Sequence, residues 1–204
     1  MKTKKAILGL ALFAALIAIT VPTVAHADAF ALNFTNPGSF FTDHTPITVG
    51  WQFQVVQPVM VYALAENWDS MFTDGSHAVG IWDLSDNALL VSAAVTSGDP
   101  QSGFWRYHSI APITLPVGTY MIGEATVDDH WSFSPIGQTT ISNIVFQNGY
   151  YTFGAGLLQP TIADFPVNSH FGPNFLVTPE PGSLCRLGSG FLCLAGVLRR
   201  RLLP

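Results

Sequence analysis

Apolar and polar residues alternate in several short segments of the chain, which is the pattern of strands with one buried face. In the clearest segment, Val49, Trp51, Phe53 and Val55 alternate with glycine and glutamine. Successive side chains of a strand point to opposite faces, so this period of two predicts a half-buried strand. Comparable segments occur at residues 59–65, 78–83, 88–95, 106–115 and 119–127.

Short turns and long polar loops alternate between these segments. The turns fall at residues 57–58, 84–87 and 116–118, and the loops at 66–77, 96–105 and 128–138. If every strand spans the full height of the domain, the turns lie at one end and the loops at the other. Because binding residues are concentrated on loops held by a rigid scaffold, the loop end is the candidate site.

Two further features complete the predicted fold. A short edge strand is expected near Phe40, and a last hairpin at 139–146 and 150–153 with Asn148-Gly149 as its turn. The alternation fades after Gly154, and no amphipathic helix is indicated upstream of the C-terminal tail. Short strands joined by regular turns predict an all-β protein, an antiparallel β-sandwich of jelly-roll or immunoglobulin-like kind.

Each long loop carries one tryptophan, Trp68, Trp105 or Trp131, together with carboxylates. An aromatic ring can stack on the C–H face of a neutral sugar while carboxylates accept its hydroxyl hydrogen bonds. The three tryptophans are therefore candidate glycan-binding residues. The alternative is that they fold back and cap the core. Exposed, clustered rings are expected for the first role and buried rings for the second.

The same loops contain weak candidates for a Ca²⁺ site, namely Asp69, Asp74, Asp128 and Asp129. Their carboxylates are suitable hard ligands, but no loop has the D-x-D-x-D-G spacing of a calcium loop. Solvated loop acids are the alternative, so no metal or other cofactor is assigned. His77, His108 and His130 are too scattered to suggest a histidine metal site, and a strand-end or surface position is expected for each.

Catalytic motifs are absent from the sequence. There is no Gly-x-Ser-x-Gly elbow, and a Ser-x-x-Lys motif is excluded because no lysine follows Lys5. Glu124 and Asp128 could form an acid pair for glycoside cleavage, but such pairs arise freely in an acidic chain, and Glu124 can equally face solvent. The chain is therefore interpreted as non-catalytic, with a secreted glycan hydrolase as the alternative.

The charge of the central region limits its partners. Residues 28–181 contain all 13 acids of the chain and a single base, Arg106, which gives a formal net charge of −12 with histidine neutral. Such a region has no basic surface for phosphates, so nucleic-acid binding is excluded. Anionic surfaces would repel it, whereas neutral sugars and cations would not.

The N-terminus has the pattern of a secretory signal peptide. Lys2, Lys4 and Lys5 precede an apolar run, and Ala25-His26-Ala27 forms a small-x-small cleavage site. Cleavage after Ala27 divides the chain into a signal peptide at 1–27, a β-sandwich domain at 28–176 and a C-terminal segment at 177–204. Both cysteines lie in that last segment, so no disulfide is expected in the domain.

The C-terminal segment consists of three parts in a fixed order. Pro179-Glu180-Pro181 is followed by an apolar run at 184–198 and then by Arg199-Arg200-Arg201. The 15 residues of the run would cover roughly 22 Å as a helix, against about 30 Å for a bilayer core. The arginines are expected to stay cytoplasmic.

This order resembles the PEP-CTERM sorting signal over about the last 25 residues. The resemblance implies export in a Gram-negative bacterium and recognition by an exosortase, which cuts near the motif. It also implies an inner-membrane intermediate, anchored by the C-terminal helix, before release to the cell surface or the extracellular polysaccharide matrix of a biofilm. Arg186 departs from the pattern because it lies inside the apolar run. The alternative for the segment is a plain C-terminal anchor. The alternative for the whole protein is a purely structural surface-layer component.

A second resemblance covers residues 47–127. The motifs Gly50-Trp51-Gln52-Phe53, His77-Ala78-Val79-Gly80-Ile81-Trp82-Asp83 and Leu115-Pro116-Val117-Gly118-Thr119-Tyr120 resemble an uncharacterised β-sandwich domain of bacterial surface proteins. This resemblance implies the fold and no particular activity.

Overall fold

The computed structural model describes residues 29–42, 44–67, 75–127, 130–164 and 171–178. All regular elements in these ranges are strands, and every strand pair is antiparallel. The predicted all-β class is thus confirmed for the described part of the chain. The predicted signal and membrane helices lie outside the described residues.

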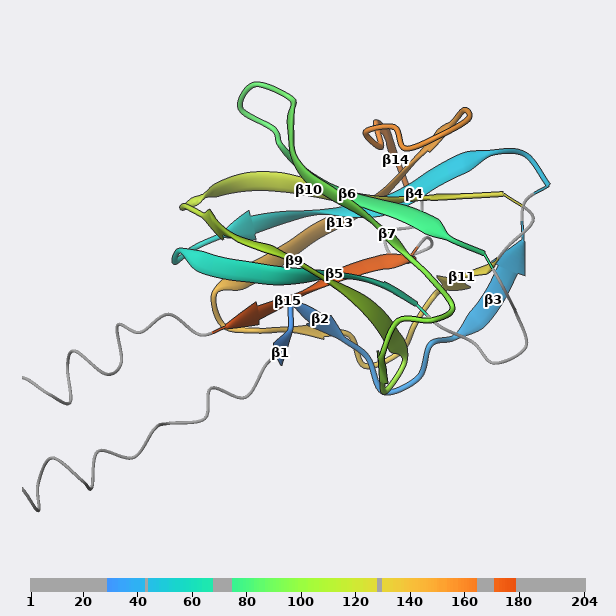
Figure 1. Cartoon of the computed structure of the whole chain (residues 1–204), viewed down its shortest axis with the longest axis horizontal. Coiled ribbons are helices and arrows are strands. Elements are labelled where there is room, and N and C mark those ends of the chain that lie inside the picture. The colour runs from blue at the N-terminus through green and yellow to red at the C-terminus, as the bar shows by residue number, and fades with distance from the viewer. Residues whose placement is uncertain (1–28, 43, 68–74, 128–129, 165–170, 179–204) are drawn as a thin grey trace, which may run out of the picture.

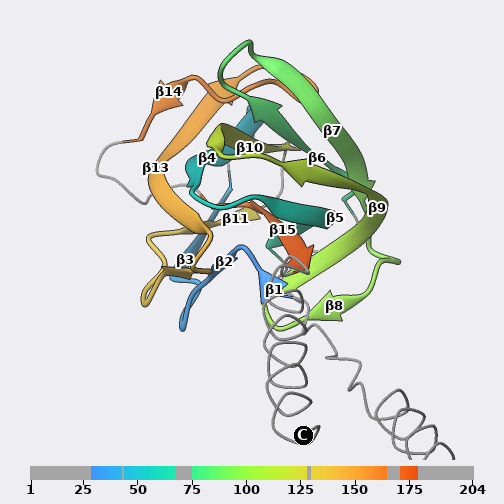
Figure 2. The same ribbon diagram turned by 90° about the vertical axis from the view of Figure 1, so that its left-hand side faces the viewer.

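Two main sheets face each other in an arrangement consistent with a β-sandwich (Figures 1 and 2). The five-stranded sheet has the order β1 (Ala29–Phe30), β15 (Pro173–Thr178), β5 (Val59–Asn67), β9 (Trp105–Leu115) and β8 (Gln101–Ser102). The six-stranded sheet has the order β14 (Ile162–Ala163), β13 (Ile144–Phe153), β4 (Ile47–Val55), β10 (Gly118–Thr126), β6 (His77–Asp83) and β7 (Ala88–Val95).

Two small sheets flank the main pair. Strand β3 (Ser39–Thr42) pairs with β11 (His130–Phe133), and β2 (Leu32–Asn33) pairs with β12 (Thr139–Thr140). The edge strand expected near Phe40 is therefore confirmed as β3.

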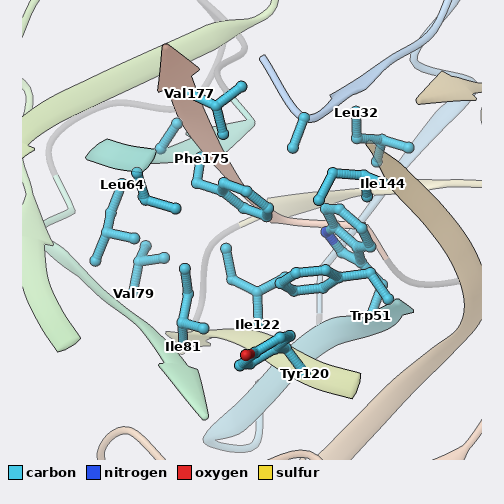
Figure 3. Packing of buried hydrophobic residues seen from close by; sticks show 14 of the residues in the cluster. Leu32, Trp51, Leu64, Val79, Ile81, Tyr120, Ile122, Ile144, Phe175 and Val177 are labelled. Atoms are coloured by element: carbon cyan, nitrogen blue, oxygen red, sulfur yellow. The ribbon is translucent and has the colours of Figure 1, made fainter. Parts of the chain in front are cut away.

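The interior between the main sheets is filled by aromatic and branched side chains (Figure 3). Trp51 and Phe53 of β4 contact Phe175 of β15, with ring centroids 6.0 Å and 5.0 Å from it, respectively. The Trp51 indole N–H donates a 2.8 Å hydrogen bond to the Pro173 carbonyl on the opposite sheet. One aromatic group therefore packs across both sheets and satisfies its buried polar atom.

Strand pairing confirms the predicted separation of turns and loops. Val55 pairs with Gly118 and Val59 with Leu115, next to the short turns. At the other end of the same strands, Ile47 pairs with Thr126, Asn67 with Trp105, and His77 with Val95. We refer to this second end, where the three long connections lie, as the loop end.

The predicted hairpin at Asn148-Gly149 is wrong. Residues 144–153 form one continuous strand, β13, which pairs along β4 and contains a register shift between Phe146 and Asn148. Gly149 is needed for a close approach rather than a turn, because a Cβ atom there would lie 2.9 Å from Asp164 Oδ2. The Asn-Gly signal thus marks a strand irregularity beside a buried carboxylate.

Several strands extend beyond their predicted limits. Glu66 and Asn67 belong to β5, and His77 begins β6, so none of them is a loop residue. Strand β15 was not predicted, although it lies between β1 and β5 in its sheet. It continues through Val177 and Thr178, two residues beyond the predicted domain boundary at 176.

We expect Phe175→Ala to lower the free energy of unfolding by about 3–5 kcal/mol, because it removes a ring that contacts Trp51 and Phe53 across the interior. The matched control is Phe153→Ala, since Phe153 is 51% exposed, and its cost should be within about 0.5 kcal/mol. Urea unfolding followed by tryptophan fluorescence measures both values. Equal costs for the two variants would contradict the assigned core.

Candidate functional site

Three ionisable side chains are buried in the interior of the domain at its loop end, among otherwise apolar residues. Glu66 is 2% exposed, Glu124 is 1% exposed and His77 is 9% exposed. They come from β5, β10 and β6, so the first lies on the five-stranded sheet and the other two lie on the six-stranded sheet. Charged residues are almost never fully buried without partners, which makes this group the most unusual feature of the described interior.

A single imidazole nitrogen lies between the two carboxylates. His77 Nδ1 is 2.8 Å from Glu66 Oε2 and 2.9 Å from Glu124 Oε1. Both are short polar contacts, and the single hydrogen that Nδ1 can carry is available to only one of the two carboxylates at a time. We call these three residues the Glu66–His77–Glu124 cluster. It joins the two main sheets through polar contacts, at the end opposite the short turns.

The six-stranded sheet contributes its two members through simple alternation. Tyr120 and Ile122 point into the interior, and Glu124 follows them at the same period of two. His77 precedes Val79 and Ile81 on β6 in the same way. The alternative that Glu124 faces solvent is therefore wrong, because its position in β10 is an inward-facing one and it is 1% exposed.

Strand β5 contributes Glu66 only because of an extra residue. Phe175 pairs with Leu64 and Val177 pairs with Val61, so three residues of β15 span four of β5. Both Val61 and Leu64 belong to the core, although they lie on opposite faces of a regular strand. The bulge reverses which residues of β5 point inward. From Leu64 onward the even-numbered positions face the interior, and Glu66 is therefore buried.

Arg106 and Gly172 adjoin the two carboxylates of the cluster. Arg106 lies directly across from Glu66 in the β5–β9 pair and is 8% exposed, so the only base of the central region is buried next to a cluster carboxylate. Its Nη1 also donates a 3.4 Å hydrogen bond to the Thr96 carbonyl. Gly172 leaves room for Glu124, because a Cβ atom there would lie 2.5 Å from Oε2.

The structure brings three potential metal-ligand atoms together, and most of them belong to residues that were not predicted as metal ligands. One ligand atom each from Glu66, His77 and Glu124 lies within 4.8 Å of the others.

The aspartates predicted as metal ligands are not among these three residues. Asp69, Asp74, Asp128 and Asp129 lie outside the described residues. His108 is elsewhere, beside Asp99, and only the backbone of His130 is described, in β11. The expected strand-end position of His77 is confirmed, but His77 is buried.

Trp105 and Trp131 do not present their rings to solvent. They are 2% and 1% exposed, respectively. Trp105 packs against Phe30 and Phe34, with ring centroids 5.9 Å and 5.1 Å away, and Trp131 packs against Ile47 and Val49. The third residue, Trp68, lies outside the described residues. Burial at two of three positions is what the core-capping alternative requires.

An open cavity of about 360 Å³ borders the cluster at His77. It is lined by Pro46 and by three short segments, at 75–78, 125–127 and 154–156. Two of the segments contain Gly75, Gly154 and Gly156, which have no side chains to fill the space. The His77 side chain is 11% exposed, whereas those of Glu66 and Glu124 are 3% and 1% exposed. Solvent access to the cluster is therefore greatest at the histidine.

A second histidine–carboxylate pair, His108 with Asp99, is more exposed than the cluster. Asp99 Oδ1 is 3.0 Å from His108 Nδ1, and Asp99 Oδ2 accepts hydrogen bonds from the Thr96 backbone N–H and hydroxyl at 2.7 and 3.0 Å. Burial raises the pKa of Asp99, but the hydrogen bonds from Thr96 and His108 and the charge of His108 outweigh it, so the pKa lies below its ordinary 3.8. This carboxylate stabilises its own loop.

No protein-family model and no curated protein sequence matches this chain. The part of the chain that the structure describes includes no helix of the length and hydrophobicity needed to cross a bilayer. The predicted cleavage residues Ala25 and Ala27, the Pro179-Glu180-Pro181 motif and the arginines at 199–201 all lie outside the described residues.

We expect Asp99→Asn to destabilise the protein near neutral pH and to lose this effect in acid. The folded-state pKa of Asp99 is lowered, so its stabilising contribution is fully present above the unfolded value of about 3.8 and disappears as the pH falls through the folded value. Unfolding free energies from pH 7 to pH 2 measure the difference. The control is Asp86→Asn, which removes the same charge from an exposed turn. A constant difference across this range would contradict the assignment.

Proposed function

We propose that this protein is an exported, non-catalytic component of the cell surface or extracellular matrix, sorted by an exosortase through its C-terminal PEP-CTERM signal. The folded domain would be a jelly-roll or immunoglobulin-like β-sandwich that remains after both terminal segments are removed. It would pass through an inner-membrane intermediate and then reside in a polysaccharide-rich biofilm matrix.

The bounds of the fold are the observation that carries this proposal. Strand β1 begins at Ala29, two residues after the expected signal-peptide cleavage, and β15 ends at Thr178, next to Pro179. The two strands pair with each other, with Ala29 opposite Val177. Cleavage after Ala27 and near Pro181 would therefore leave every described strand intact, as a processed export substrate requires.

The interior supports a non-catalytic role over the hydrolase alternative. A glycosidase holds its two carboxyl groups about 5–9.5 Å apart on either side of the scissile bond. Glu124, one member of the candidate acid pair, is 1% exposed and lies 2.9 Å from His77 Nδ1, so a sugar has no access to its carboxylate. Asp128, the other member, lies outside the described residues.

The role in the matrix is proposed to be mainly structural. Burial of Trp105 and Trp131 favours packing over sugar stacking for these two rings. The acidic central region, with its single base, would tolerate neutral polysaccharide while being repelled by anionic surfaces. Association with neutral exopolysaccharide would then depend on Trp68 or on surfaces other than the three loop tryptophans.

We expect the tail to be removed near Pro181 only in a host that contains the sorting enzyme. Intact mass and membrane fractionation would be compared with and without that enzyme, for the natural chain and for Pro179→Ala/Pro181→Ala. The double variant should keep its tail and stay in the membrane fraction. Pro204→Ala is the control, because it makes the same change in the same segment but outside the motif.

Retention of the tail by the natural chain in the presence of the enzyme would contradict the sorting proposal. A plain C-terminal anchor would then explain the segment. Loss of the tail from the double variant at the natural rate would also contradict it, because cleavage would not depend on the motif.

A further inference from the structure

We propose that Glu66, His77 and Glu124 form a binding site for a divalent transition-metal ion, with Zn²⁺ as the best match to their chemistry. The proposal concerns the interior of the domain and does not depend on how the protein is exported or sorted. It assigns a ligand to three buried residues that the proposed surface function leaves unused.

The donor set indicates the class of metal. Two carboxylate oxygens and one imidazole nitrogen suit Zn²⁺ and its first-row neighbours, whereas Ca²⁺ and Mg²⁺ prefer oxygen ligands only. Ligands at about 2.0–2.1 Å from Zn²⁺ in a tetrahedron are about 3.3 Å apart. His77 Nδ1 is now 2.8 and 2.9 Å from the two oxygens, so shifts of a few tenths of an ångström would open the site for an ion.

The charge of the site favours a cation. Two buried carboxylates face one imidazole. Apart from histidine, Arg106 is the only base among the described residues of the central region. Burial of like charges costs several kcal/mol per ion unless opposite charge compensates it. A divalent cation at the centre would supply that compensation directly to both carboxylates.

Rigid elements hold the three ligands. Each side chain projects from a strand rather than a loop, and each strand is paired on both sides within its sheet. Gly172 lies so close to Glu124 Oε2 that any larger residue would displace this carboxylate. Metal ligands that project from strands, and that have further residues packed against them, are positioned more accurately than metal ligands on loops.

The cavity beside His77 gives an ion a route to the site. It is open to solvent and borders the most exposed of the three ligands. Three protein ligands leave one position of a tetrahedron for a water molecule, and the cavity side is where that position can be solvated. A bound ion would connect β5 to β6 and β10, and thus one main sheet to the other.

The test uses the full-length chain without a histidine tag and with Cys185→Ser/Cys193→Ser, so that tag and tail thiols cannot bind the metal. Melting temperatures would be measured after EDTA treatment and again with added Zn²⁺. Zn²⁺ at about 100 times its Kd should raise the melting temperature by about 5–10 °C for a protein of this size.

Three further variants assign the site. His77→Gln and Glu124→Gln should each weaken Zn²⁺ binding by about 100-fold or more, measured by competition with a zinc-binding dye, because each removes a direct ligand. His108→Gln is the matched control, since His108 also faces a carboxylate but only one, and it should leave the affinity unchanged. An effect of His108→Gln equal to that of His77→Gln would overturn the proposal.

X-ray absorption of the zinc-loaded protein tests the site without a cluster variant. The proposal requires a first shell of nitrogen and oxygen at about 2.0–2.2 Å. Absence of bound zinc after dialysis, together with an unchanged melting temperature, would show that the three residues form only a hydrogen-bonded polar cluster and would overturn the proposal.

Discussion

The contact between Glu66 on one sheet and His77 on the other exists because strand β5 contains an extra residue. Val61 and Leu64 both pack into the core, opposite Val177 and Phe175. Without this bulge, Leu64 and Glu66 would point away from the six-stranded sheet. The bulge therefore has two consequences: it fills the core beneath Phe175, and it places a carboxylate within 2.8 Å of the His77 imidazole.

The two ends of the domain are held together by different interactions. In the middle of the domain, Trp51, Phe53 and Phe175 pack across the sheets, and the Trp51 indole donates a hydrogen bond to Pro173, which is paired with Glu66. At the loop end, the contacts of His77 with Glu66 and Glu124 are added to the apolar packing of Trp105. The domain has no cysteine, so no disulfide can link its sheets. A buried polar contact between sheets is costly unless all its groups are compensated, which gives the loop end a specific requirement for charge balance.

The sequence allowed much of the six-stranded sheet to be predicted, because its strands alternate. Val49, Trp51 and Phe53 on β4 are a clear case, since one face is buried and the other is more polar. Strand β15 was missed because its residues are buried on both faces, including Asn174, which bonds to the Leu32 backbone. A strand without alternation that begins with proline has no period-two signal.

The cluster could be predicted only in part. His77 and Glu66 were recognised as polar residues at the ends of a long loop, and the pairing of the strands confirms that these ends meet. Their burial could not be predicted, because a single-residue bulge in β5 has no signature in the sequence. For Glu124 the necessary signal was present, because it continues the inward period of Tyr120 and Ile122; an acidic residue at such a position indicates a buried partner.

The most direct test of this account is a double-mutant cycle between the sheets, in metal-free buffer. Unfolding free energies would be measured for the natural chain, Glu66→Gln, His77→Gln and the double variant. The account predicts that the double variant loses about 0.5–3 kcal/mol less than the sum of the two single losses, because the residues are in contact. Losses that add to within about 0.3 kcal/mol would contradict a cross-sheet contact between Glu66 and His77.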